Sequence, residues 1–164
     1  MQLEVIYEWL QNTKVADAIG ESSYLFPLLE SLHVLSITAM MGSIALVDLR
    51  LVGWINRDRP VSQVLREVLP LTIGAFISSV ITGTLLFTSH AVQYMRNGPF
   101  VAKMALMGVA GINIVVFHGV IQRSMPQWDL GKPPPRAVIA GSISLVLWIV
   151  IVACGRWIGF TSAV

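Results

Sequence analysis

The chain has 164 residues, of which 55% are hydrophobic and only 12% are charged. A soluble domain of this size carries about a quarter of its residues as charged side chains, so the composition excludes that class and indicates an integral membrane protein. The net charge of +2 comes from Lys and Arg residues spread along the chain, without the basic stripe that a nucleic-acid partner would require. The single cysteine, Cys154, excludes an intramolecular disulfide.

Residues 1–20 have the spacing of an amphipathic helix, with Ile6, Tyr7 and Leu10 near one side. A helix of this kind is typical of the membrane surface, so we predict a short interfacial helix at 1–20. The segment lacks the order of basic then apolar residues found in a secretory signal, and we expect no cleaved leader.

Four apolar stretches follow, each long enough to cross a bilayer. The predicted spans are residues 24–52, 69–95, 100–122 and 136–157. The turn at 96–99 is so short that the second and third spans must be antiparallel neighbours. We therefore predict an all-α membrane protein, with an antiparallel four-helix transmembrane bundle over residues 24–160. Trp148 lies far from both ends of its span and is expected to face a neighbouring helix.

The distribution of Lys and Arg predicts the orientation. The loops after the first and third spans hold seven of these residues, whereas the N-terminal segment, the 96–103 turn and the tail hold four. The positive-inside rule then places both termini outside the cytoplasm, in the periplasm of a Gram-negative host.

A carboxylate and an imidazole lie one helical turn apart inside the first span, at Glu30 and His33. Ionisable groups cost about 2.5–3.5 kcal/mol each at the centre of a membrane helix, so these two residues need partners and indicate a site. At the rise of an α-helix, His33 and His90 both lie about 8–10 Å below the outer interface and can be level on facing helices. His118 lies about 25 Å from that interface and cannot share a small site with them.

A level pair of imidazoles on neighbouring membrane helices is what a b-type haem requires. We therefore predict His33 and His90 as axial ligands to the metal. Glu30 would orient an imidazole by accepting its second N–H. Gly83, seven residues before His90, would leave room for the porphyrin.

Three cations at the outer edge, Arg96, Lys103 and Arg156, would neutralise the haem propionates. The expected function is electron transfer between a quinone pool and a redox partner protein. A chain this small is expected to act as a homo-oligomer or as a subunit of a larger complex. Enzyme templates are absent, so we do not expect an enzyme on its own.

Two alternatives remain open. His33 and His90 with Met95, Met104 and Met107 offer imidazole and thioether ligands, a set that selects copper(I), so the protein could handle or transport copper. Alternatively, the chain is a cofactor-free structural subunit of a membrane complex.

A second group of polar residues is expected near the inner surface. Asp48 and Arg50 reach it from the first span and His118 from the third, and Asn113 of the third span is a further candidate. Such a cluster could hold a second ligand or pass protons.

Several segments resemble a family of small, uncharacterised bacterial membrane proteins with four spans. They are Glu30-Ser31-Leu32-His33, Gly42-Ser43-Ile44, Asp48-Leu49-Arg50-Leu51, Gly83 with Leu86-Phe87, Phe100 with Lys103, and Asn113 with Phe117-His118. The resemblance implies the four-span fold and a bacterial inner membrane but brings no established activity. More remotely, the chain looks like four-helix membrane cytochromes b and copper-resistance permeases. The family pattern includes His33, Lys103 and His118 but not His90, which leaves the second axial ligand open between His90, Lys103 and another subunit.

Overall fold

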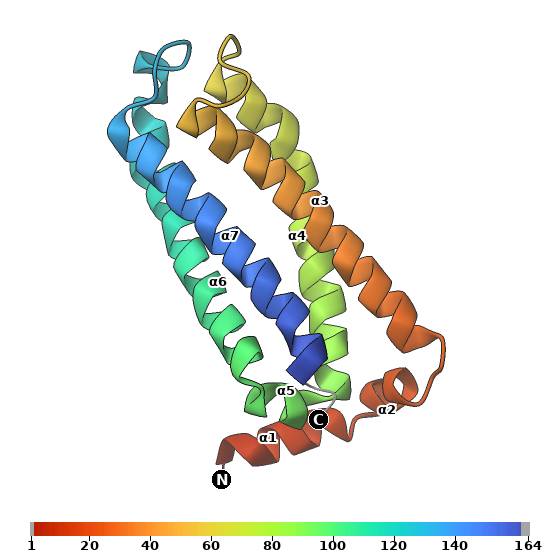
Figure 1. The fold of residues 1–164 in the computed structure, drawn as a ribbon. Coiled ribbons are helices and arrows are strands. Elements are labelled where there is room, and N and C mark those ends of the chain that lie inside the picture. Colours follow the sequence, from red (N-terminus) through yellow and green to blue (C-terminus); the bar gives the residue numbers. More distant parts are fainter. Residues whose placement is uncertain (1, 162–164) are drawn as a thin grey trace.

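The computed structural model of this chain describes residues 2–161. The described residues form four long helices, which run side by side in Figure 1. They are α3 (Leu25–Val52), α4 (Val61–Ser89), α6 (Gly98–Val116, continued by η1, Phe117–Ile121, and η2, Gln122–Gln127) and α7 (Pro135–Thr161). Each is long and apolar enough to cross a bilayer. The predicted all-α four-helix bundle is therefore confirmed, and the chain is a multi-pass membrane protein.

Three short helices lie at one end of the bundle (Figure 1). They are α1 (Gln2–Gln11), α2 (Lys14–Gly20) and α5 (Ala91–Arg96). The predicted helix at 1–20 is thus divided in two, because Thr13 starts a new helix by accepting a hydrogen bond from the Ala16 amide at 3.3 Å. We call this the terminal end, since α1 and the end of α7 lie here. The opposite end, with the two polar loops, is the loop end.

The four long helices form an open arrangement. Helix α3 packs along both α4 and α7, and α6 packs along α7. Helices α4 and α6, by contrast, scarcely contact each other over the described residues. The bundle is therefore closed on three sides only, which decides where a cavity can open.

Small and hydroxyl-bearing residues join the helices that do pack closely. Ser36 contacts Ser78 and Thr72 donates to Ser43 between α3 and α4, both at 2.7 Å. Interhelical hydrogen bonds and small residues are the usual means of association in lipid, where burial of apolar surface gives no net drive.

The outward faces of the helices are apolar. Leu35, Val115, Val146 and Ile149 are each at least 60% exposed on the surface of the bundle. Apolar side chains in such positions are typical of a lipid-facing surface. The bilayer is therefore the partner of these faces.

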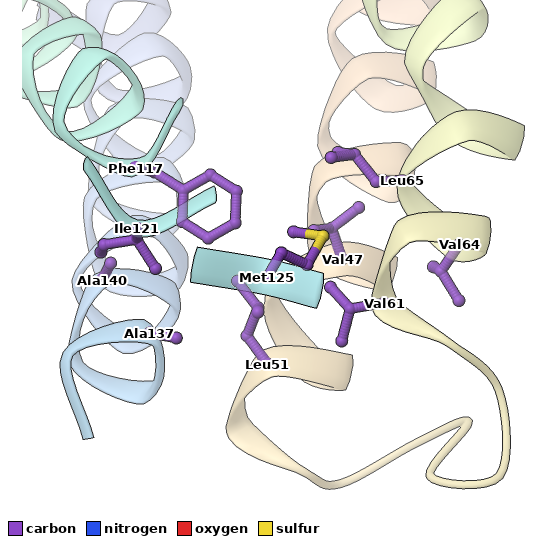
Figure 2. Close-up of a cluster of buried hydrophobic side chains, with 10 residues drawn as sticks. All are labelled: Val47, Leu51, Val61, Val64, Leu65, Phe117, Ile121, Met125, Ala137 and Ala140. Carbon is purple, nitrogen blue, oxygen red and sulfur yellow. The ribbon is translucent and has the colours of Figure 1, made fainter. Parts of the chain in front are cut away.

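A cluster of buried apolar side chains holds the loop end together (Figure 2). Its members are Val47, Leu51, Val61, Val64, Leu65, Phe117, Ile121, Met125, Ala137 and Ala140. Figure 2 shows Met125 between the α3/α4 pair and the α6/α7 pair. We refer to this set as the loop-end cluster, and it joins the α3/α4 pair to the α6/α7 pair.

Asp129, in the loop before α7, caps the N-terminal end of α4. Its carboxylate accepts hydrogen bonds from the Ser62 amide at 2.7 Å and the Ser62 hydroxyl at 2.5 Å. Its backbone carbonyl accepts from the Val61 amide at 3.2 Å. Asp129 thus acts as a helix cap supplied from elsewhere in the chain, because it satisfies first-turn amides that have no partner within α4.

Replacing Asp129 by Ala should lower the free energy of unfolding by about 1–2 kcal/mol, the usual cost of losing a helix cap. The measurement is thermal unfolding of the purified protein in detergent micelles. Asp58→Ala, in the exposed loop after α3, is the matched control and should leave the midpoint unchanged. Equal midpoints for the two variants would show that the Asp129 cap does not stabilise α4.

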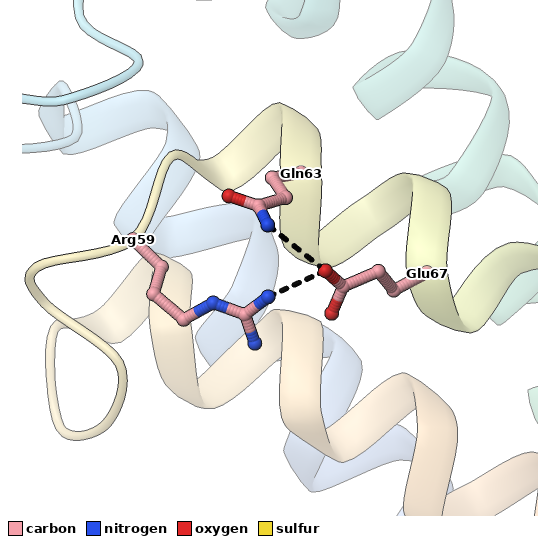
Figure 3. Close-up of polar contacts among 3 residues, drawn as sticks. All are labelled: Arg59, Gln63 and Glu67. Atoms are coloured by element: carbon pink, nitrogen blue, oxygen red, sulfur yellow. Dashed lines mark hydrogen bonds and ion pairs between the residues drawn. The ribbon is translucent and has the colours of Figure 1, made fainter.

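A second polar group lies on the surface of the loop end. Glu67 accepts hydrogen bonds from Arg59 at 2.5 Å and from Gln63 at 3.0 Å (Figure 3). The Arg59 and Glu67 side chains are both exposed to a large extent, and exposed ion pairs contribute little to stability. The role of this pair is to orient the loop rather than to hold the helices together.

Candidate functional site

The His33 ring is already engaged by helix α4. Its Nδ1 atom lies 2.9 Å from the Thr82 hydroxyl oxygen. A Cβ atom at Gly83 would lie only 2.8 Å from His33 Cε1. Gly83 therefore makes room for the imidazole itself rather than for a porphyrin.

His90 lies in a different place from the one expected. It is the residue between α4 and α5, where it contacts the ring of Phe26 with 5.5 Å between centroids. Phe26 is seven residues before His33, and His90 is seven residues after Gly83, which contacts His33. The two imidazoles are therefore offset by about 10 Å along the bundle. The predicted level pair is corrected, because α4 ends at Ser89 instead of continuing to Met95.

The residues expected around His33 also have other contacts. Glu30 is exposed, and its charge acts on Tyr94, whose pKa is raised first by burial and then by that carboxylate. Lys103 is partly buried and extends along α7, where its Nζ atom is 3.7 Å from the position of a Cβ at Gly155. Lys103 and His33 are close enough to interact electrostatically.

The other two cations expected at the haem propionates lie on the surface. Arg96 forms an ion pair with Glu4 at 3.5 Å, and the Arg156 guanidinium lies 5.0 Å from the centre of the Phe160 ring. Together with the offset of the two imidazoles, these contacts do not fit a haem held between His33 and His90.

The methionines of the copper alternative are dispersed. Met104 is half exposed on α6, whereas Met107 packs beside the buried Met40 and Trp148. Over the described residues, no three His, Cys, Asp or Glu side chains are placed to hold a metal ion.

A cavity of about 540 Å³ lies in the loop-end half of the bundle. Its walls come from all four long helices, and Leu65 to Phe76 of α4 face Met107 to His118 of α6 across it. The volume is within the range of small-molecule sites, about 300–1,000 Å³. Because α4 and α6 scarcely contact each other, the cavity is open toward the lipid between them.

Two buried polar atoms at this cavity have no hydrogen-bond partner: Asp48 Oδ2 on α3 and Trp148 Nε1 on α7. Both residues line the cavity, and they are only 6% and 5% exposed. The Ser144 hydroxyl lies close to the Asp48 carboxyl group, whose Oδ2 atom has no partner. An unsatisfied buried polar group costs about 1–3 kcal/mol, and a polar partner at this wall would remove that cost.

Two further members of the second predicted group line the same cavity. Asn113 donates a hydrogen bond from Nδ2 to the Ala140 carbonyl at 3.1 Å and so joins α6 to α7. His118 lies at the rim, on the π-helical turn η1, and is hydrogen-bonded to Gln122. Single π-helical turns occur frequently at functional sites.

Arg50 is the member of that group that lies apart from the cavity. Its side chain is 1% exposed and donates from Nε to the Arg59 carbonyl at 3.0 Å and from a terminal nitrogen to the Arg57 carbonyl at 3.4 Å. Arg50 therefore holds the loop after α3.

Comparison with known proteins gives a family match. The model of a family of unknown function, DUF6644, matches residues 6–161. The chain belongs to this family. The resemblance to an uncharacterised family is thereby supported, while no curated protein and no solved structure matches the chain. Because the family brings no activity, the function of this member has to be argued from its site.

Sequence reasoning brought Asp48, Asn113 and His118 forward but missed Ser144 and Trp148 as parts of the same site. The available signal was the position of Trp148, which suits neither membrane interface. Its expected contact with a neighbouring helix is confirmed, since the side chain is buried in the cluster around Met40. A buried indole N–H without an acceptor could not be recognised without the fold.

Proposed function

We propose that this protein binds a lipid-soluble small molecule in the cavity between its four long helices. The observation that carries the proposal is an apolar cavity of about 540 Å³ with an unpartnered carboxyl oxygen and an unpartnered indole N–H on one wall. Ligand sites have this composition, with a mainly apolar lining and a few polar groups that orient the bound molecule.

The proposed route to the cavity is lateral. Five members of the loop-end cluster also line the cavity and form its floor: Val47, Leu51, Leu65, Phe117 and Ala140. This floor separates the cavity from the polar loops. The side between α4 and α6 faces lipid, so the molecule is drawn from the bilayer.

Gly111 gives a direct test, because it lines the cavity and a Cβ there meets no atom within 4 Å. Gly111→Phe should fill the space and weaken binding at least about tenfold, as expected when apolar contacts worth 1.4 kcal/mol or more are lost. The probe is 1-bromodecane, whose bromine quenches indole fluorescence. It is used on protein in which the other four tryptophans, Trp9, Trp54, Trp128 and Trp157, are replaced by Phe, so that the fluorescence comes from Trp148 alone.

The matched control is Gly108→Phe, one turn away on α6, where a Cβ also meets no atom within 4 Å and which does not line the cavity. Saturable quenching should persist in this control and be lost in Gly111→Phe. Equal quenching in both variants would show that the probe binds elsewhere.

The proposed location is a bacterial inner membrane with both termini in the periplasm. The excess of Lys and Arg in the loops after the first and third spans supports this orientation. In a Cys154→Ser background, a membrane-impermeant maleimide added to intact cells should label Glu21→Cys but not Asp58→Cys. Labelling of Asp58→Cys alone would reverse the topology.

Electron transfer through haem b and the handling of copper are the other functions proposed from the sequence, and both depend on His33. The contacts of His33 with Thr82 and Gly83 and its offset from His90 argue against them. We expect purified protein to have no Soret band and no bound copper. A Soret band that His33→Ala abolishes would restore the haem proposal and the likeness to membrane cytochromes b, and stoichiometric copper would restore the likeness to permeases.

A role as a subunit remains compatible with binding in the cavity. Self-association or association with a redox partner would be measured as the mass of the complex extracted from native membranes. A cofactor-free scaffold, the third proposal, would bind no molecule in the cavity and is therefore tested by the same Gly111→Phe experiment.

A further inference from the structure

The polar atoms of the cavity lie together on its back wall, opposite the opening. Ser144 contacts Asp48, and Trp148 follows Ser144 by four residues on α7. Residues four apart lie on the same face of a helix, about one turn from each other. The free carboxyl oxygen and the indole N–H therefore lie on the same wall, about one helical turn apart along the bundle, while α4 and α6 form the opposite side.

The two atoms make complementary demands on a ligand. The indole Nε1–H can only donate a hydrogen bond, so it requires an acceptor. The free Asp48 oxygen accepts a hydrogen bond when the carboxyl group is ionised and can donate one when the group is protonated, so a hydroxyl group satisfies it in either state. A head group that satisfies both atoms must carry a donor and an acceptor close together.

We infer that the ligand of this cavity is a quinol: a ring bearing hydroxyl groups, with an apolar tail that leaves between α4 and α6. This inference rests on the proposed function and names the class of molecule that the cavity takes. A ring hydroxyl donates to Asp48 Oδ2, and a ring oxygen accepts from Trp148 Nε1.

The other common lipid-soluble molecules satisfy the wall less well. A hydrocarbon leaves both atoms without a partner. An alkylammonium pairs with Asp48 but has no lone pair for the indole N–H. A fatty-acid carboxylate accepts from the indole but brings a second negative charge beside Asp48.

A chain alcohol also carries both a donor and an acceptor. The remaining residues that line the cavity favour a flat ring over such a chain. Phe76, Phe117 and Met107 present aromatic and thioether side chains to the cavity. Such groups make favourable contacts with rings. Gly111 and Gly141 have no side chain, so they leave space for a ring at two of the walls.

The test compares four molecules with the same ten-carbon chain in lipid nanodiscs by calorimetric titration. They are a decyl-substituted benzoquinol, 1-decanol, decylamine and 1-bromodecane. The quinol is expected to bind at least about tenfold more tightly than 1-bromodecane, which corresponds to one or two net hydrogen bonds of about 0.5–1.5 kcal/mol each. Decanol should fall between the two, because it lacks the ring.

Trp148→Phe keeps the aromatic ring but removes the N–H. It should weaken the quinol about fivefold to tenfold, as expected for one hydrogen bond, and leave 1-bromodecane unchanged. Trp128→Phe is the matched control, since its indole donates to Ser124 in the loop and lies outside the cavity. Asp48→Asn retains an acceptor oxygen, so the quinol should change by less than about threefold.

Each alternative outcome has a distinct meaning. Decylamine binding more tightly than the quinol, with a loss of at least about tenfold in Asp48→Asn, would overturn the quinol assignment in favour of a cationic amphiphile. Decanol binding as tightly as the quinol would show that no ring is recognised. Equal affinities for all four molecules, abolished by Gly111→Phe, would overturn the assignment while leaving the proposed function intact. Binding that Gly111→Phe does not affect would overturn the proposed function itself.

Discussion

Gly141→Leu is expected to destabilise the bundle by about 3 kcal/mol, near the upper end of the usual cost of overpacking. At Gly141, on α7, a Cβ atom would lie 3.1 Å from Leu51 Cβ and 3.2 Å from the Asp48 carbonyl oxygen on α3. The second of these atoms belongs to the backbone, so the contact cannot be relieved by a rotamer change. The two helices must separate, and the back wall of the cavity moves with them.

The measurement for Gly141→Leu is unfolding of the purified protein by increasing proportions of sodium dodecyl sulfate in mixed micelles. Gly108→Leu is the matched control, because a Cβ at that position meets no atom within 4 Å. The control should be neutral or slightly stabilising, since leucine is a better helix former than glycine by about 1 kcal/mol. If both variants unfold at the same proportion of dodecyl sulfate, α3 and α7 do not approach as closely as described.

Arg50→Ala is the second substitution with a large expected effect: it should lower the free energy of unfolding by about 3 kcal/mol. The buried guanidinium supplies donors to the carbonyls of Arg59 and Arg57, and its removal leaves both acceptors without that partner. Each lost acceptor partner costs about 1–3 kcal/mol where the group stays buried. The loop after α3 should become sensitive to protease as well.

The measurement for Arg50→Ala combines thermal unfolding with limited proteolysis of the loop at residues 53–60. Arg66→Ala, an exposed arginine near the start of α4, is the control and should match the wild type in both. An Arg50→Ala protein as stable and as resistant as this control would contradict the role given to Arg50.

The spans could be predicted from the sequence because continuous apolar runs bounded by polar loops specify membrane helices directly. Their ends could be predicted less well. The chain changes direction at His90, in a stretch without charged residues from Leu69 to Tyr94, so composition gave no reason to end the helix there. The predicted helix at 1–20 failed in the same way, because the cap at Thr13 depends on one local hydrogen bond.

The prediction of a site between His33 and His90 failed because it depended on the depth of each residue in the membrane. To pair His33 with His90, one must know the residue at which α4 ends and the direction of each side chain. Hydrophobic periodicity predicts neither of them. Asp48 could be recognised as unusual from its residue type alone. That its free oxygen lines the same cavity as an unpartnered indole from α7 follows only from the packing of α3 on α7.

The most direct test of the central claim is photolabelling in native membranes with a decyl-benzoquinol that carries a diazirine on its ring. The account predicts label on cavity residues, Asp48 and Met107 among them, and loss of that label in Gly111→Phe. Label confined to outward-facing residues such as Val146 and Ile149, unchanged in Gly111→Phe, would contradict it.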